Sequence, residues 1–117
     1  MLTVYAYRSC STCRKAIAHL TDKGIAFSEK PIREQPPTPA ELRRVLKANG
    51  GEIRRLFNTS GQDYRALGIA EKLKGMDDEA AIALLASNGN LVKRPLVVGP
   101  KVALCGFKPD EWAAAEL

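Results

Sequence analysis

The chain has 117 residues, of which 45% are hydrophobic and 26% are charged, and its formal net charge is +5 at pH 7. This balance is typical of a globular protein with one core, and it argues against a disordered chain or two independent domains. The first residues lack the basic start and apolar stretch of a secretory signal, and no apolar run approaches the roughly 20 residues of a membrane span, so we expect a single-domain cytoplasmic protein with no membrane partner.

The first part of the chain predicts a strand, a helix and a second strand. Leu2–Tyr7 alternates β-branched and aromatic residues with small ones, which is typical of a strand. Residues 11 to 23 carry apolar side chains at helical spacing, and Gly24 follows as a C-terminal stop. Ile25–Glu29 is the second predicted strand. This succession indicates a right-handed βαβ unit with two parallel strands.

The middle of the chain is predicted to be almost entirely helical. Thr38-Pro39-Ala40-Glu41 is a capping box with proline at the first helical position, and it opens a helix that ends at Asn49-Gly50-Gly51. Asp77-Asp78-Glu79 begins a further helix that ends near Asn88-Gly89. Shorter helical segments are expected at residues 53–57 and through Tyr64 and Leu67.

Beta structure returns near the end of the chain. Leu96–Val98 and residues 102 to 105 flank Gly99-Pro100, which predicts an antiparallel hairpin. Pro109 then lies early in a short helix anchored by Trp112. The expected fold class is α/β: a mixed four-stranded sheet built from β-α-β and β-β-α halves, with a helical insert at about residues 38–90.

Cys10-Ser11-Thr12-Cys13 places two thiols between the first strand and the first helix. The nucleophile in thiol chemistry is the thiolate, which the N–H groups and positive dipole end of a helix favour. Arg14 next to this motif either lowers the pKa of Cys10 or is an ordinary solvated residue. Cys10 is therefore the candidate nucleophile, although free cysteines also occur as buried hydrophobic residues.

The remaining cysteines and the single histidine limit the other kinds of thiol site. Cys13 lies one helical turn after Cys10, so it is either a resolving thiol or part of the core. Zinc needs about four ligands, and beyond the Cys-x-x-Cys pair the chain offers only Cys105 and His19, which disfavours a metal site. Cys105 is expected to be packed in a strand rather than catalytic. His19 receives no role.

The net positive charge suits an acidic partner, an oxyanion or a nucleic acid. The distribution of the charge decides little between these, because acids are interspersed among the basic residues. No direct nucleic-acid binding is expected.

Several further motifs accompany the Cys-x-x-Cys pair over essentially the whole chain. They are Pro36-Pro37-Thr38, Leu56-Phe57-Asn58-Thr59-Ser60-Gly61, Tyr64-Arg65-Ala66-Leu67-Gly68, Lys93-Arg94-Pro95-Leu96 and Gly106-Phe107. With this combination the sequence resembles the thioredoxin fold and, more specifically, the ArsC/Spx/MgsR family of arsenate-reductase-like proteins.

The resemblance implies a substrate site around Cys10. Arg94 would lie near the reactive thiol and hold an oxyanion or a glutathione carboxylate bidentately, whereas the plain alternative is a solvated loop residue. Pro95 would have a cis peptide bond beside the cysteines, the alternative being a trans proline that begins a strand. The substrate-binding candidates are Ser11, Thr12, Arg14, Asn58 and Pro95, and the catalytic candidates are Cys10, Cys13 and Arg94.

The chain departs from the glutaredoxin-coupled arsenate reductases of this family at three positions. By the resemblance, those proteins have an isolated cysteine and three arginines around the oxyanion. In this chain Cys13 lies three residues after Cys10, and Asn58 and Gly106 stand where two of the arginines align. The Cys-x-x-Cys pair is similar to that of Spx, a regulator that binds the α subunit of RNA polymerase, although Ser60 aligns with an arginine that is important in Spx.

The function implied by the resemblance is a thiol-dependent oxidoreductase with a Cys10–Cys13 dithiol/disulfide cycle. Its substrate would be an oxyanion, a glutathione mixed disulfide or a protein disulfide. Glutathione, a glutaredoxin or a thioredoxin-type protein would serve as reductant, and no tightly bound cofactor is expected. The alternative is a redox-sensing regulator that binds RNA polymerase.

Overall fold

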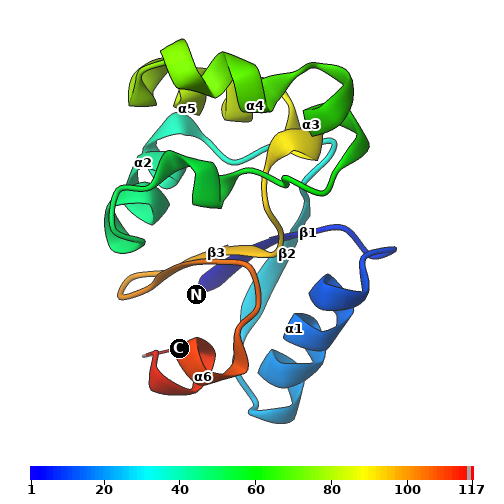
Figure 1. Cartoon of the computed structure of the whole chain (residues 1–117). Helices are drawn as coiled ribbons and strands as arrows, with labels where there is room; N and C mark the ends of the chain where they lie inside the picture. The colour runs from blue at the N-terminus through cyan, green and yellow to red at the C-terminus, as the bar shows by residue number, and fades with distance from the viewer. Residues whose placement is uncertain (116) are drawn as a thin grey trace.

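A computed structural model describes residues 1–115 and 117 of the chain. Within these residues, four strands form one mixed sheet in the order β2-β1-β3-β4 (Figure 1). The strands are β1 (Leu2–Ala6), β2 (Phe27–Pro31), β3 (Leu96–Val98) and β4 (Ala103–Cys105). Strand β1 pairs with β2 in parallel and with β3 antiparallel, and β3 pairs with β4 antiparallel. The predicted βαβ unit and the later hairpin are both confirmed.

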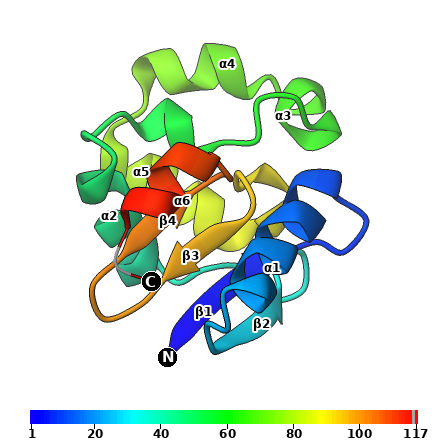
Figure 2. The same cartoon turned by 90° about the horizontal axis from the view of Figure 1, so that it is seen from below.

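Helices cover both faces of the sheet (Figure 1, Figure 2). One face carries α1 and α6, and the other carries the helices that lie between β2 and β3 in the sequence. The helices are α1 (Ser11–Asp22), α2 (Pro39–Ala48), α3 (Gln62–Ala66), α4 (Ile69–Lys72), α5 (Asp78–Ser87) and α6 (Pro109–Ala114), and the 3-10 turns are η1 (Ile53–Leu56), η2 (Leu73–Gly75) and η3 (Gly89–Leu91). None of the described helices is long and apolar enough to cross a membrane.

Alternate residues of the central strands divide the buried side chains into two clusters. Val4 of β1 packs on the α1 side, together with Leu20 and Trp112. Tyr5, the next residue, packs on the opposite side among the residues of α2 and α5. This alternation follows from the period of two in a β-strand. The sheet therefore lies between two hydrophobic clusters, one on each face.

The predicted capping box of α2 is present and also ties the helix to the sheet. The Thr38 side chain accepts the Glu41 backbone N–H at 3.2 Å, and the Thr38 N–H donates to Glu41 Oε1 at 3.0 Å. The same Oε1 accepts the hydroxyl of Tyr5 at 2.7 Å. Because the Tyr5 side chain is buried, this carboxylate fixes the helix start over the central strand.

Strand boundaries differ from the sequence prediction by one or two residues. Strand β1 ends at Ala6 rather than Tyr7, β2 spans Phe27–Pro31 rather than Ile25–Glu29, and β4 begins at Ala103 rather than at residue 102. Gly24 adopts a φ of +68°, and the Ile25 N–H bonds back to the Leu20 carbonyl at 3.0 Å, so Ile25 closes the helix instead of pairing with β1. Helix α4 and turn η2 were not predicted, because the segment is too short for a clear helical repeat.

Candidate active site

Cys10 is the N-cap residue of α1, just beyond the carboxyl end of β1. Its backbone N–H donates to the Tyr7 carbonyl at 2.9 Å, which closes the turn from strand to helix. The side chain is partly buried and opens into a cavity of about 380 Å³, which we call the thiol cavity. The thiol cavity is lined by Cys10, Thr12, Phe57, Asn58, Thr59, Ser60, Lys93, Arg94, Gly106, Phe107 and Lys108.

The surroundings of Cys10 stabilise its thiolate. Burial raises the pKa of the Cys10 thiol, but the backbone N–H and thiol of Cys13, the backbone N–H of Thr12 and the charge of Arg94 together outweigh it. The pKa of Cys10 is therefore lowered from its ordinary value. The thiol caps no N–H at full hydrogen-bond geometry in the structure, so the N–H groups act as nearby dipoles at the start of the helix.

Cys13 has the opposite environment, although it lies only one helical turn away. Its side chain is fully buried, and burial raises the pKa of the thiol to about 12, with the negative charge of Cys10 adding to the increase. The Tyr7 backbone N–H donates to Cys13 Sγ at 3.5 Å and acts in the other direction. Both cysteines are free thiols, and they differ sharply in how easily they ionise.

Arg94 reaches the thiol cavity from the loop before β3. The peptide bond between Arg94 and Pro95 is cis, as the resemblance implied. The guanidinium stacks over the Tyr7 ring at 5.2 Å from the ring centroid. Its Nη1 atom is buried and has no hydrogen-bond partner within the described part of the chain. A buried guanidinium nitrogen without a partner is suited to an acidic group of a ligand.

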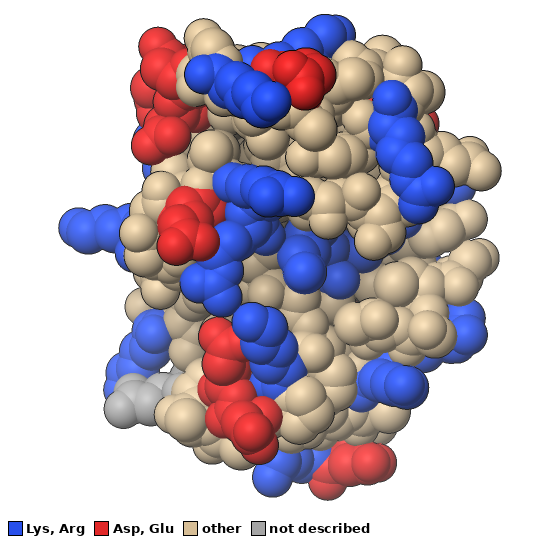
Figure 3. Space-filling view, in the orientation of Figure 1, with Lys and Arg blue, Asp and Glu red and all other residues tan. Residues whose placement is uncertain are grey.

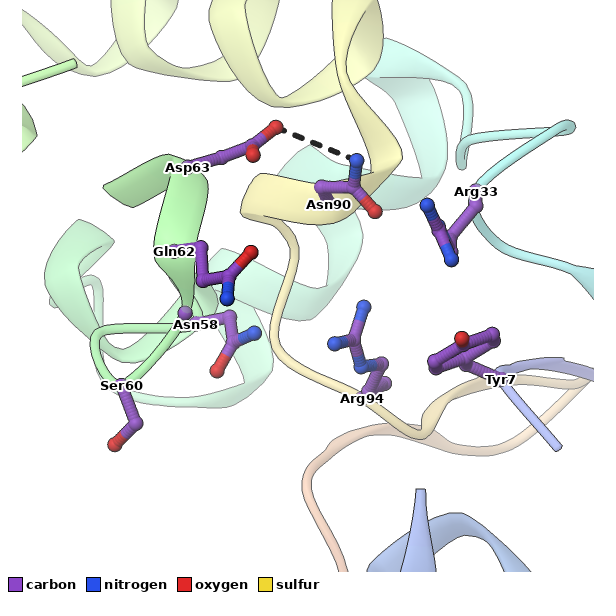
Figure 4. A pocket seen from close by; sticks show the side chains of 9 residues that line it. Tyr7, Arg33, Asn58, Ser60, Gln62, Asp63, Asn90 and Arg94 are labelled. Atoms are coloured by element: carbon purple, nitrogen blue, oxygen red, sulfur yellow. Dashed lines mark hydrogen bonds between the residues drawn. The ribbon is translucent and has the colours of Figure 1, made fainter. Parts of the chain in front are cut away.

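A second cavity, of about 480 Å³, lies on the other side of Arg94, and we call it the arginine cavity. Asn58, Ser60 and Arg94 line both cavities. Arg33 and Arg94 extend into it beside Tyr7, whereas Ser60 points away (Figure 4). Its complete lining is Tyr7, Arg33, Asn58, Ser60, Gly61, Gln62, Asp63, Asn90 and Arg94.

The structure brings together most of the candidate site residues. Cys10, Thr12, Asn58 and Arg94 line the thiol cavity, with the buried Cys13 behind Cys10. Pro95 is buried next to Arg94.

Two substrate-binding candidates lie outside these cavities. Ser11 and Arg14 are exposed and line neither of them. The Arg14 guanidinium donates to the Arg8 carbonyl at 2.9 Å. The guanidinium that lowers the pKa of Cys10 is that of Arg94.

Tyr7 and Arg33 were not among the candidates from the sequence. Each comes just after one of the two parallel strands, Tyr7 after β1 and Arg33 after β2. Ligand sites in α/β sheets occur outside the carboxyl ends of parallel strands, so this position was the signal that could have identified them.

The other titratable candidates have packing roles in the structure. Cys105 Sγ lies 3.5 Å from the Arg55 carbonyl oxygen, and burial raises the pKa of this thiol to about 12. The His19 ring packs edge-on against Phe107 and Trp112, with ring centroids 5.5 and 5.8 Å away. Among the residues that the structure describes, no group of three or more histidine, cysteine or acidic side chains could hold a metal ion.

Comparison with known sequences identifies relatives along almost the whole chain. The model of the ArsC family matches residues 5–115. The uncharacterized protein YusI of Bacillus subtilis is 42% identical over 111 residues, which cover 95% of this chain and 94% of YusI. The regulatory protein MgsR of the same organism is 30% identical and covers 94% of this chain and 86% of MgsR. The global transcriptional regulator Spx of Enterococcus faecalis is 30% identical, and the match covers 95% of this chain and 83% of Spx.

Solved structures agree with the sequence matches. An ArsC family related protein from Bacteroides fragilis superposes with a TM-score of 0.89 at 43% identity, covering 96% of this chain and 94% of that one. A possible arsenate reductase from Streptococcus mutans gives a TM-score of 0.87 at 41% identity, covering 97% and 98%. The expected α/β class with a thioredoxin-like sheet is therefore confirmed.

Proposed function

The chain belongs to the ArsC family, and we propose that it is a thiol-dependent oxidoreductase in which Cys10 and Cys13 cycle between a dithiol and a disulfide. One observation carries the proposal. Cys10 opens into a cavity that it shares with Arg94, while Cys13 is buried one helical turn behind it with a raised pKa. An accessible thiolate backed by a protected thiol is the arrangement that a two-step thiol exchange requires.

In the first step the Cys10 thiolate attacks one sulfur of a disulfide substrate. A bond forms between Cys10 Sγ and that sulfur, the substrate S–S bond breaks, and the second sulfur leaves with the electron pair as a thiolate. Arg94 is positioned to hold an acidic group of the substrate, because its Nη1 lacks a partner in the described residues and its side chain lines the same cavity as Cys10. The product is a mixed disulfide on Cys10.

In the second step Cys13 loses its proton and attacks Cys10 Sγ. The Cys10–Cys13 disulfide forms, and the substrate fragment leaves as a second thiol, so the two cysteines are oxidised and the substrate is reduced. The pKa of Cys13 falls once Cys10 is bonded, because the Cys10 charge that helped to raise it has gone. The Tyr7 N–H remains on Cys13 Sγ and stabilises the developing thiolate.

The cycle closes when an external thiol reduces the Cys10–Cys13 disulfide. Glutathione, a glutaredoxin or a thioredoxin-type protein is the proposed reductant. An oxyanion such as arsenate is the second substrate class. Cys10 Sγ would bond to arsenic with loss of one oxygen as water, and the attack of Cys13 on Cys10 Sγ would break the S–As bond, leave its electron pair on arsenic and release arsenite. The solved arsenate-reductase-like relative supports this class.

The direct test combines thiol reactivity with turnover. We expect the pH profile of Cys10 alkylation by iodoacetamide to lie below that of free cysteine, which titrates near 8.5, because the surroundings of Cys10 lower its pKa. Turnover of a glutathione mixed disulfide or of arsenate, with glutathione as reductant, should disappear in Cys10→Ser, and Cys13→Ser should accumulate the Cys10 adduct. A Cys10 titration at or above pH 8.5 would contradict the proposal.

The second candidate function is a redox-sensing regulator, which the relatives named MgsR and Spx favour. In this function the same disulfide would form but would change a binding surface for the α subunit of RNA polymerase rather than turn over. Stoichiometric polymerase binding that changes on oxidation, without turnover of either substrate class, would favour the regulator. Turnover without polymerase binding would favour the oxidoreductase.

A further inference from the structure

The arginine cavity concentrates positive charge next to the thiol cavity. Both Arg33 and Arg94 lie over the ring of Tyr7, with guanidinium carbons 4.9 and 5.2 Å from the ring centroid. No carboxylate pairs with either guanidinium in the part of the chain that the structure describes. Two guanidinium groups that share one aromatic ring repel each other unless an anion lies between or beside them.

The rest of the lining supplies neutral hydrogen-bonding groups. The amides of Asn58 and Gln62 face Arg94 across the cavity (Figure 4). The hydroxyl of Tyr7 is acidified, because a hydrogen bond from Ser9 and the charge of Arg33 lower its pKa. Figure 3 shows Lys and Arg side chains across the middle of the face seen in Figure 1, with Asp and Glu side chains among them.

Asp63 is the acidic residue of the lining, and it limits where an anion can sit. Its Oδ2 accepts hydrogen bonds from Asn88 at 3.1 Å and from Asn90 at 3.3 Å, which hold it at the end of the cavity away from Tyr7 (Figure 4). A bound anion would therefore lie at the Arg33 and Arg94 end.

The two cavities are neighbours that share lining residues. Arg94 and Asn58 line both of them, and Tyr7, which lines the arginine cavity, bonds the backbone of Cys10 and the sulfur of Cys13. A ligand attached to Cys10 could thus extend past Arg94 toward Arg33. The thiol cavity holds the reacting sulfur, and the arginine cavity is a separate place for the other end of the molecule.

From this arrangement we infer that the arginine cavity binds a carboxylate carried by the thiol or disulfide substrate at the end remote from its sulfur, and that Arg33 determines the preference for such substrates. The inference rests on the proposed thiol exchange at Cys10. Planar guanidinium groups bind carboxylates through paired hydrogen bonds, so Arg33 adds a second contact beyond the one available at Arg94.

The test uses symmetrical disulfides of straight-chain mercapto acids, from propionate to hexanoate, beside their methyl esters. The rate of mixed-disulfide formation on Cys10 is measured by intact mass in a Cys13→Ser background, where the adduct accumulates. We expect the acid-to-ester rate ratio to rise with chain length to about tenfold, because one charge-assisted contact is of this order. If Arg94 alone attracted the carboxylate, the preference would already be present with the shortest acid, and the acid-to-ester rate ratio would not rise with chain length.

Arg33→Gln should remove the rise with chain length, and Arg33→Lys should restore part of it. Arg44→Gln is the matched control, because this exposed arginine of α2 lines neither cavity and its loss removes the same charge. A ratio independent of chain length, or an equal loss in Arg44→Gln, would overturn the inference.

Alkylation by iodoacetamide, which is neutral, separates this inference from the proposed function. Arg33→Gln should leave Cys10 alkylation unchanged while the acid-to-ester ratio falls. If the alkylation profile of Cys10 in the otherwise unchanged protein lies at or above that of free cysteine, which titrates near 8.5, the proposed function fails. If the profile lies below that of free cysteine but no carboxylate preference is found, the inference about Arg33 fails alone.

Discussion

Cys10 and Cys13 are three residues apart, yet the pKa values of their thiols shift in opposite directions. Cys10 lies at the open N-terminus of α1 beside Arg94, so its pKa falls, whereas burial among the residues around α1 raises the pKa of Cys13 to about 12. The helix period places the second thiol inward and one turn behind the first. This difference is the reason why we propose that Cys10 attacks and Cys13 resolves.

Removing the charge of Arg94 should raise the pKa of Cys10. Its positive charge favours the thiolate, so in Arg94→Gln the pH profile of iodoacetamide alkylation should move to higher pH. The measurement is the alkylation rate of Cys10 between pH 5 and 10. Arg44→Gln removes an equal charge outside both cavities and should leave the profile in place. An unshifted profile in Arg94→Gln would contradict a contribution of Arg94 to the lowered pKa of Cys10.

The start of α2 depends on Glu41 more than on its partner in the capping box. Thr38→Ala removes one cap and should lower the free energy of unfolding by about 1 kcal/mol. Glu41→Ala removes the other half of the box and also leaves the buried Tyr5 hydroxyl without its acceptor, which costs about 1–3 kcal/mol.

Urea unfolding of these variants measures both effects. Because Tyr5→Phe removes the hydroxyl itself, the extra cost of Glu41→Ala should shrink in the Tyr5→Phe background. Equal costs of Glu41→Ala in both backgrounds would contradict the tie between α2 and β1.

Local patterns predicted the elements well where one short segment determines them. The capping box at Thr38 and the stop at Gly24 are decided by neighbouring residues, and both occur where they were predicted. The start of β2 was wrong by two residues, because the hydrogen bond from Ile25 back to Leu20 is a helix-end feature that strand propensity does not include.

Part of the lining of the thiol cavity was predictable from the sequence, whereas the arginine cavity was not. Cys10 and Arg94 were identified from a motif and a resemblance, and they line one cavity. Arg33 is exposed and belongs to no motif, so its position after a predicted strand was the one signal in the sequence. The parallel pairing of β1 with β2 brings it to the ring of Tyr7.

At the scale of the whole molecule, the folded state retains protons on buried groups that the unfolded chain would lose. Burial raises the pKa of Cys13 and of Cys105 to about 12, and it also raises the pKa of Tyr5. Unfolded cysteine ionises near 8.5. Unfolding therefore releases protons in the interval between these values, and the free energy of unfolding should fall as pH rises from about 8.5 toward 12.

Urea unfolding under reducing conditions at a series of pH values from 8 to 11 measures this fall. In Cys105→Ala the curve should be shallower, because one of the raised thiols is gone. A stability that is constant over this interval would contradict the buried, protonated state of these thiols.

The formation of a Cys10–Cys13 disulfide from a Cys10 adduct tests the central claim most directly. The reduced protein is mixed with a limiting amount of glutathione disulfide, quenched with acid at successive times, and analysed by intact and peptide mass. We predict an early glutathione adduct on Cys10 that converts to a protein two hydrogens lighter than the reduced form, with a Cys10–Cys13 bond. In Cys13→Ser the adduct on Cys10 should persist. A first adduct on Cys13 or Cys105, or a Cys10 adduct that never resolves in the presence of Cys13, would contradict the claim.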